Sequence, residues 1–192
     1  MARPAKFDPD QILDVAAAVA AESGHEAVTI TAIAARLGAP SGSIYHRYGS
    51  RDLLLAHLWV RTVRRFQEGF LQAIATQDLE QAIRLATAHT VRWSAAYPDE
   101  ARLLLTQHVR DLSARWPDEF GEELSRLNDA TTRAMAELAR RSDCDLERMV
   151  FALVDVPLAA VRRHLQARKP IPDSAAEMAE TAALAVVLAT CL

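Results

Sequence analysis

Apolar residues recur at helical spacing along most of the chain, in stretches bounded by capping residues, glycines or prolines. The first stretch begins at Asp8, where Pro9 and Gln11 complete the spacing of a capping box, and it ends at Gly24. This pattern predicts an amphipathic helix that packs behind the elements following it and has no binding role of its own.

The next two apolar stretches meet at a glycine. Residues 31–37 carry their apolar side chains on one face, and Gly38 can adopt the positive φ that closes a helix. The following helix begins at Pro40 or Ser41 and has Ile44 as its buried anchor. Two helices joined by so tight a turn predict a helix-turn-helix, whose second helix enters the major groove of DNA.

Six residues at fixed spacing identify this unit more closely: Ala34, Gly38, Ile44, Tyr45, Tyr48 and Arg51. They resemble the N-terminal domain of tetracycline-repressor (TetR) family regulators, and the likeness runs from about Phe7 to Leu55. Pro40 stands where the family often has serine, and Arg51 where lysine is usual. The family's aromatic and cationic character is otherwise kept.

The resemblance implies how this unit meets DNA. Four residues are expected to face base edges or nearby phosphates, and four more to hold the phosphate backbone, which fixes register rather than sequence. The first set is Ser41, Gly42, Ser43 and His46, and the second is Thr31, Tyr45, Arg47 and Arg51.

The remainder of the chain predicts helices only, giving an all-α fold of about nine helices. Ser50 caps a long helix that extends to about residue 76, with Arg61, Arg64 and Arg65 expected on its solvated side. Further helices are expected at 79–97, 98–108, 118–141, 145–165 and from 174 onward. Pro157, inside one of them, predicts a kink.

A set of aromatic and polar residues in this second part has two interpretations. They could form an ordinary helical core, or an apolar effector cavity with a few polar groups. The resemblance favours the cavity, because the family's C-terminal body usually holds an effector pocket. The set is Phe66, Phe70, His89, Trp93, His108, Trp116 and Phe151.

The last two helices offer apolar surface for a homodimer, since specific DNA binding generally uses two reading units on a two-fold site. Their apolar positions could instead complete the core of one protomer. The predicted interface residues are Val154, Leu158, Val161, Ala179, Ala183, Val186 and Val187.

Composition and charge add little. Residues 1–65 hold eight Lys and Arg against six acidic residues, and residues 66–192 hold fourteen against nineteen, so the basic excess lies at the DNA-reading end. Cys144 and Cys191 lack metal or redox spacing. No catalytic, cofactor or metal motif and no membrane span is predicted, which favours a non-enzyme in the cytoplasm.

Together these patterns predict a transcriptional regulator with a DNA-binding domain at 1–55 and an effector-binding and dimerisation domain at 56–192. A repressor released from a palindromic operator by an unidentified small molecule is expected. The alternatives are an activator or ligand-independent regulator of the same fold, and a helical carrier or enzyme without a DNA role.

Overall fold

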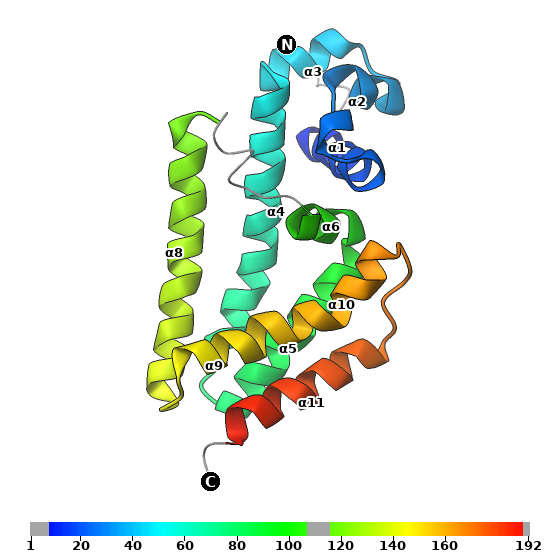
Figure 1. Cartoon of the computed structure of the whole chain (residues 1–192). Helices are drawn as coiled ribbons and strands as arrows, with labels where there is room; N and C mark the ends of the chain where they lie inside the picture. Colours follow the sequence, from blue (N-terminus) through cyan, green and yellow to red (C-terminus); the bar gives the residue numbers. More distant parts are fainter. Residues whose placement is uncertain (1–7, 107–115, 190–192) are drawn as a thin grey trace.

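The computed structural model describes residues 8–106 and 116–189, and within these ranges the chain is helical without strands (Figure 1). The α-helices are α1 (Pro9–Ser23), α2 (Ile30–Leu37), α3 (Ser41–Tyr48), α4 (Arg51–Ile74), α5 (Leu79–Ala96), α6 (Pro98–Thr106), α8 (Asp118–Arg141), α9 (Leu146–Val150), α10 (Val156–Gln166) and α11 (Ser174–Leu188). A 3₁₀ turn, η1 (His25–Ala27), follows α1, and a π-helical turn, η2 (Phe151–Asp155), joins α9 to α10. The all-α prediction is confirmed.

Side-chain caps fix where several helices begin. Asp8 accepts a hydrogen bond from the backbone N–H of Asp10 and forms the expected capping box with Gln11. Thr29, Ser50 and Asp78 cap α2, α4 and α5 in the same way. Because these caps satisfy backbone donors that a helix start leaves unpaired, the boundaries could be read from the sequence.

The long helix α4 is the axis of the molecule, with α1, α2 and α3 at one end, α5 and α11 toward the other, and α8 running alongside it (Figure 1). One buried cluster joins α1–α4 to Leu103, Trp116 and Leu124 from later in the chain. A second joins α4, α5, α8, η2 and α11 around Phe70 and Leu153. One continuous helix therefore belongs to both cores, and no linker separates helices α1–α3 from the body.

The kink expected at Pro157 takes a different form. The proline is the second residue of α10, and the π-helical turn η2 lies directly before α10. Proline cannot donate to the carbonyl four residues back, and its ring crowds that carbonyl, so the wider turn accommodates it.

Most of the predicted dimer-interface residues prove to be core residues of the protomer. Val161, Ala179, Ala183 and Val187 are at most 3% exposed, because α11 packs along α5 and α10. The prediction for these four is wrong: periodicity identified apolar positions but not the partner covering them. The apolar surface that this part of the chain leaves exposed comes from Val154, which belongs to the predicted set, and from five residues that do not: Leu146, Val150, Phe151, Met178 and Leu188.

Among the described residues, no helix combines the length and hydrophobicity needed to cross a membrane. Those residues also contain no group of three or more His, Cys, Asp or Glu side chains arranged to hold a metal ion.

Candidate nucleic-acid interface and internal cavity

The corner between α2 and α3 has the predicted geometry. Gly38 is left-handed, with φ 63° and ψ 31°, and the N–H of Ala39 donates to the carbonyl of Ala34 across 2.9 Å. This bond satisfies a carbonyl at the end of α2, as in a Schellman motif. Ala34 and Ile44 are almost fully buried. The small Ala34, the left-handed Gly38 and the bulky Ile44 thus hold the two helices together.

The structure settles where α3 begins. Pro40 occupies the N-cap position in an extended conformation, and Ser41 is the first helical residue. The backbone N–H and the hydroxyl of Ser43 both donate to the carbonyl of Pro40, at 3.0 and 2.7 Å. The backbone N–H groups of Ser41 and Gly42 therefore lie at the N-terminus of α3. Such a helix terminus is suited to bind a phosphate oxygen.

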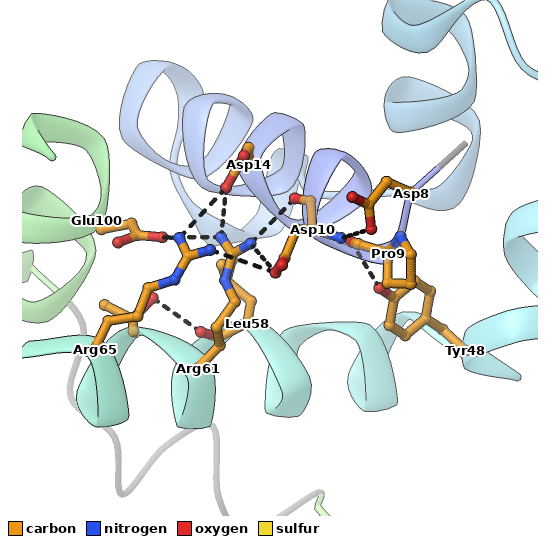
Figure 2. A network of polar contacts seen from close by, with 10 residues as sticks. Asp8, Pro9, Asp10, Asp14, Tyr48, Leu58, Arg61, Arg65 and Glu100 are labelled. Carbon is orange, nitrogen blue, oxygen red and sulfur yellow. Dashed lines mark hydrogen bonds and ion pairs between the residues drawn. The ribbon is translucent and has the colours of Figure 1, made fainter. Parts of the chain in front are cut away.

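One face of α3 is solvent-exposed. It consists of Ser41, Gly42, Ser43, Tyr45, His46 and Arg47, with Thr31 of α2 also exposed. Tyr48 differs: its ring is buried and its hydroxyl donates to the carbonyl of Pro9 across 3.1 Å (Figure 2). The two tyrosines, three residues apart, therefore have different roles. Tyr45 is available to a partner, and Tyr48 fixes α3 against the start of α1.

Arg51 does not point toward the exposed face of α3. Its Nε donates to the carbonyl of Val28 and its Nη2 to that of His25, both at 2.7 Å, and Asp52 and Glu26 lie within ion-pair distance. The prediction of a phosphate contact from Arg51 is therefore corrected. Its guanidinium instead holds η1 and the start of α2 against α4. The donors of this planar group are satisfied by two backbone carbonyls.

Within the body of the molecule lies a cavity of about 330 Å³ between α4, α5, α6, α8, η2 and α10. Its wall is mainly apolar. Among the seven residues predicted to line an effector pocket, Phe66, Phe70 and Trp93 do so. Phe66 is the centre of an aromatic group, with its ring centroid 5.9 Å from Phe70 and 5.2 Å from Trp93.

Three other predicted pocket residues lie elsewhere, and a fourth falls outside the described residues. Trp116 packs against Trp59 in the core beside α1, and Phe151 is on the outer surface with half its area exposed. His89 sits behind the cavity, with Nε2 2.8 Å from the carbonyl of Phe66, and burial lowers its pKa. His108 is in the segment that the structure does not describe.

Conversely, three residues predicted for the dimer interface line the cavity: Val154, Leu158 and Val161. The π-helical turn places Leu153 and Val154 in the same wall. Sequence periodicity could not separate these roles, because one helix face meets the cavity in part and solvent in part.

A polar network between α1, α4 and α6 was not predicted. Figure 2 shows Arg61 and Arg65 of α4 directed at Asp10 and Asp14 of α1 and at Glu100 of α6. Arg61 lies 3.0 Å from Asp10 and 2.8 Å from both Asp14 and Glu100. The placement of these two arginines on the solvated side of α4 was wrong, because α1 and α6 cross that side.

A further contact joins the end of α1 to the segment that follows α10. Arg168, after α10, donates to the carbonyls of Ala21 and Glu22 at 2.8 and 2.6 Å. These are among the last carbonyls of α1, which a cation also stabilises through the helix dipole. Both ends of α1 are thus bound to the body by arginines.

Residues 12–58 match the family model for bacterial regulatory proteins of the tetR family. No curated protein matches the sequence significantly. Three solved structures show the likeness of the whole fold. PfmR, a TetR family transcriptional regulator from Thermus thermophilus, has a TM-score of 0.74 at 19% identity, covering 95% of this chain and 97% of that chain.

The other two structures are matched over a similar share of both chains. A TetR-like transcriptional regulator from Rhodococcus sp. RHA1 has a TM-score of 0.69 at 21% identity, with 96% and 97% of the two chains covered. FadR from Bacillus subtilis, solved in complex with stearoyl-CoA, has a TM-score of 0.67 at 16% identity, with 94% and 98% covered.

The helix-turn-helix and the fold are those of TetR-type transcriptional regulators. Residues 12–58 match the tetR family model, and the chain as a whole shares its fold with solved TetR-family regulators, as the sequence resemblance predicted.

Proposed function

We propose that this protein is a homodimeric repressor that binds a palindromic operator and is released when a small molecule enters its cavity. Residues 1–55 would read the DNA, and residues 56–192 would bind the effector and the second protomer. One observation carries the proposal. Glu100 of the polar network and Ala101 of the cavity wall are consecutive residues of α6.

The exposed face of α3 is the proposed DNA-reading surface. Ser41, Gly42, Ser43 and His46 meet base edges or nearby phosphates, while Tyr45, Arg47 and Thr31 hold the backbone. Their exposure supports this assignment. Ser41, Gly42 and Ser43 also lie at the start of α3, where recognition helices contact bases. Arg51 has no place in this set.

The coupling follows from the position of α6. A molecule packed against Ala101 and Leu104 favours a different position of α6 if it fits that position better. Glu100 moves with the helix, and with it the anchorage of Arg61 and of α1. The two α3 helices of a dimer then no longer match half-sites about 34–36 Å apart.

The proposed dimer uses the exposed residues between α9 and α11, among them Val154, in place of the four predicted residues that are buried. Phe151 is 51% exposed and Met178 is 53% exposed, and both belong to the last helices of the chain. The turn η2 and helix α11 pack against each other, and exposed apolar patches mark protein interfaces in soluble proteins.

Fluorescence anisotropy with a labelled duplex from upstream of the gene tests the DNA-binding part. Tyr45→Ala is expected to lower affinity at least tenfold while leaving Tm unchanged, since the ring is exposed. Tyr97→Ala, a comparably exposed tyrosine on the body, is the matched control. Equal affinity of the three proteins across a salt series would refute the assignment.

A further inference from the structure

The chemistry of the cavity wall restricts the molecule that it accepts. Gln67 of α4 lines the cavity and is 8% exposed. Its Nε2 donates to Oδ1 of Asn128 across 3.4 Å, while its Oε1 is buried without a hydrogen-bond partner among the described residues. A buried carbonyl oxygen is costly to leave unpaired, so a ligand that donates to it gains affinity.

Two hydroxyl groups in the wall are, like Oε1 of Gln67, hydrogen-bond acceptors toward a ligand. Thr90 donates its proton to the carbonyl of Ala86 across 3.2 Å, and Thr131 donates to the carbonyl of Leu127 across 3.3 Å. With their protons used inside their own helices, these side chains can offer a ligand only oxygen lone pairs. Ser94, also in the wall, has a hydroxyl that can donate or accept. Oε1 of Gln67 and the hydroxyl oxygens of Thr90 and Thr131 are acceptors, so a ligand with a donor suits the cavity.

Charge restricts the ligand further. None of the described residues that line the cavity is ionisable. A carboxylate or an ammonium group placed there would lose its hydration without meeting an opposite charge, which is strongly unfavourable. The wall is instead formed by Phe66, Trp93, Leu104 and similar side chains, which fit an uncharged apolar body.

Size sets a third limit. A cavity of about 330 Å³ has room for roughly eleven groups the size of a water molecule, taken as about 30 Å³ each.

From these observations we infer that the cavity binds a small neutral molecule with an apolar body and one hydrogen-bond donor, of the phenol, alcohol or primary-amide class. The donor pairs with Oε1 of Gln67, and the body lies among Phe66, Phe70 and Trp93. This inference rests on the proposed function only in treating the bound molecule as the effector. The binding itself is independent of DNA.

A matched series of probes tests the inference by isothermal titration calorimetry on the full chain without DNA. The probes are 4-butylphenol, its methyl ether 4-butylanisole, and 4-butylbenzoate. The phenol is expected to bind roughly tenfold more tightly than the ether, the equivalent of one well-made hydrogen bond. The benzoate, charged at pH 7.5, is expected to bind most weakly. Equal affinity of phenol and ether, or tightest binding of the benzoate, would overturn the inference.

Variants place the probe within the cavity. Gln67→Leu should bring the affinity for the phenol down to that for the ether, whereas Gln72→Leu, on an exposed position of the same helix, should change neither. Thr131→Phe should obstruct the cavity and weaken both probes, while Thr132→Phe, exposed on the same helix, should leave both unaffected. Unchanged binding in both Gln67→Leu and Thr131→Phe would place the ligand elsewhere.

The two proposals fail separately. If the phenol binds as expected but does not displace the operator in the anisotropy assay, release by an effector is refuted and the cavity chemistry stands. If the operator is bound but phenol and ether bind alike, the DNA-binding function stands and the assigned ligand class is wrong.

Discussion

Arg61 Nη2 on α4 lies 2.8 Å from Glu100 Oε1 on α6, and only 11% and 5% of the two side chains are exposed. The carboxylate also accepts from Arg65 at 3.0 Å. Buried charges of this kind need several partners to offset the loss of hydration. The pair therefore makes the position of α6 relative to α4 depend on a few short contacts.

The first prediction concerns this pair. Glu100→Gln should lower the free energy of unfolding by about 3 kcal/mol, the lower end for breaking a buried ion pair, because Arg61 keeps its two aspartate partners. Urea denaturation measures the change. Glu80→Gln breaks the exposed pair with Arg84 and should cost under about 1 kcal/mol. Equal effects of the two variants would contradict a buried network.

The second prediction separates two arginines four residues apart. Arg51→Ala removes two hydrogen bonds to backbone carbonyls and should lower stability by about 1–3 kcal/mol. Arg47→Ala, at an exposed position, should leave Tm unchanged but weaken operator binding and reduce the salt slope of the affinity by about 1. Thermal melts and anisotropy on both variants provide the comparison. The reverse pattern would restore Arg51 as the phosphate contact.

The third prediction concerns the approach of α4 to α5. A methyl group at Gly69 would overlap the imidazole ring of His89. Gly69→Ala should therefore destabilise the protein by about 1–3 kcal/mol. Gly121→Ala meets nothing within 4 Å in its helix and should instead stabilise by about 0.4–1 kcal/mol. Adding His89→Ala to Gly69→Ala should remove most of the steric cost, which a double-mutant cycle would show as a strong coupling.

The fourth prediction is a pH dependence. Burial lowers the pKa of His89, although the Phe66 carbonyl partly opposes the shift. The unfolded chain, with a histidine pKa near 6.5, therefore binds the proton more readily than the folded chain. The contribution of His89 to stability should be full above about pH 7.5 and be lost as pH falls through about 6.5 toward the folded pKa. His89→Gln should flatten this part of the stability profile. Identical profiles for the wild type and His89→Gln would contradict the prediction.

The fifth prediction tests the dimer surface. Phe151→Asp and Met178→Asp place a charge in the proposed apolar interface and should shift the protein to monomer in analytical ultracentrifugation. Leu85→Asp, at an exposed apolar position on α5, should leave the oligomeric state unchanged. A wild-type monomer at micromolar concentration would refute the interface.

Local chemistry explains what the sequence determined. Asp8, Thr29, Ser50 and Asp78 cap helices within three residues of themselves, and Gly38 turns the chain where it stands. These interactions depend on near neighbours only, so their spacing was enough to predict the helices and the helix-turn-helix. The family resemblance came from the same short stretch.

Tertiary structure alone decided which neighbour each helix face meets. Arg61 has its partners 39 and 51 residues away, Arg51 reaches carbonyls 23 and 26 residues away, and Val161 is buried within its own protomer. An apolar or cationic position on a helix specifies what it requires, burial or an opposite charge. The packing of distant helices determines whether a core, a cavity or a polar network supplies it.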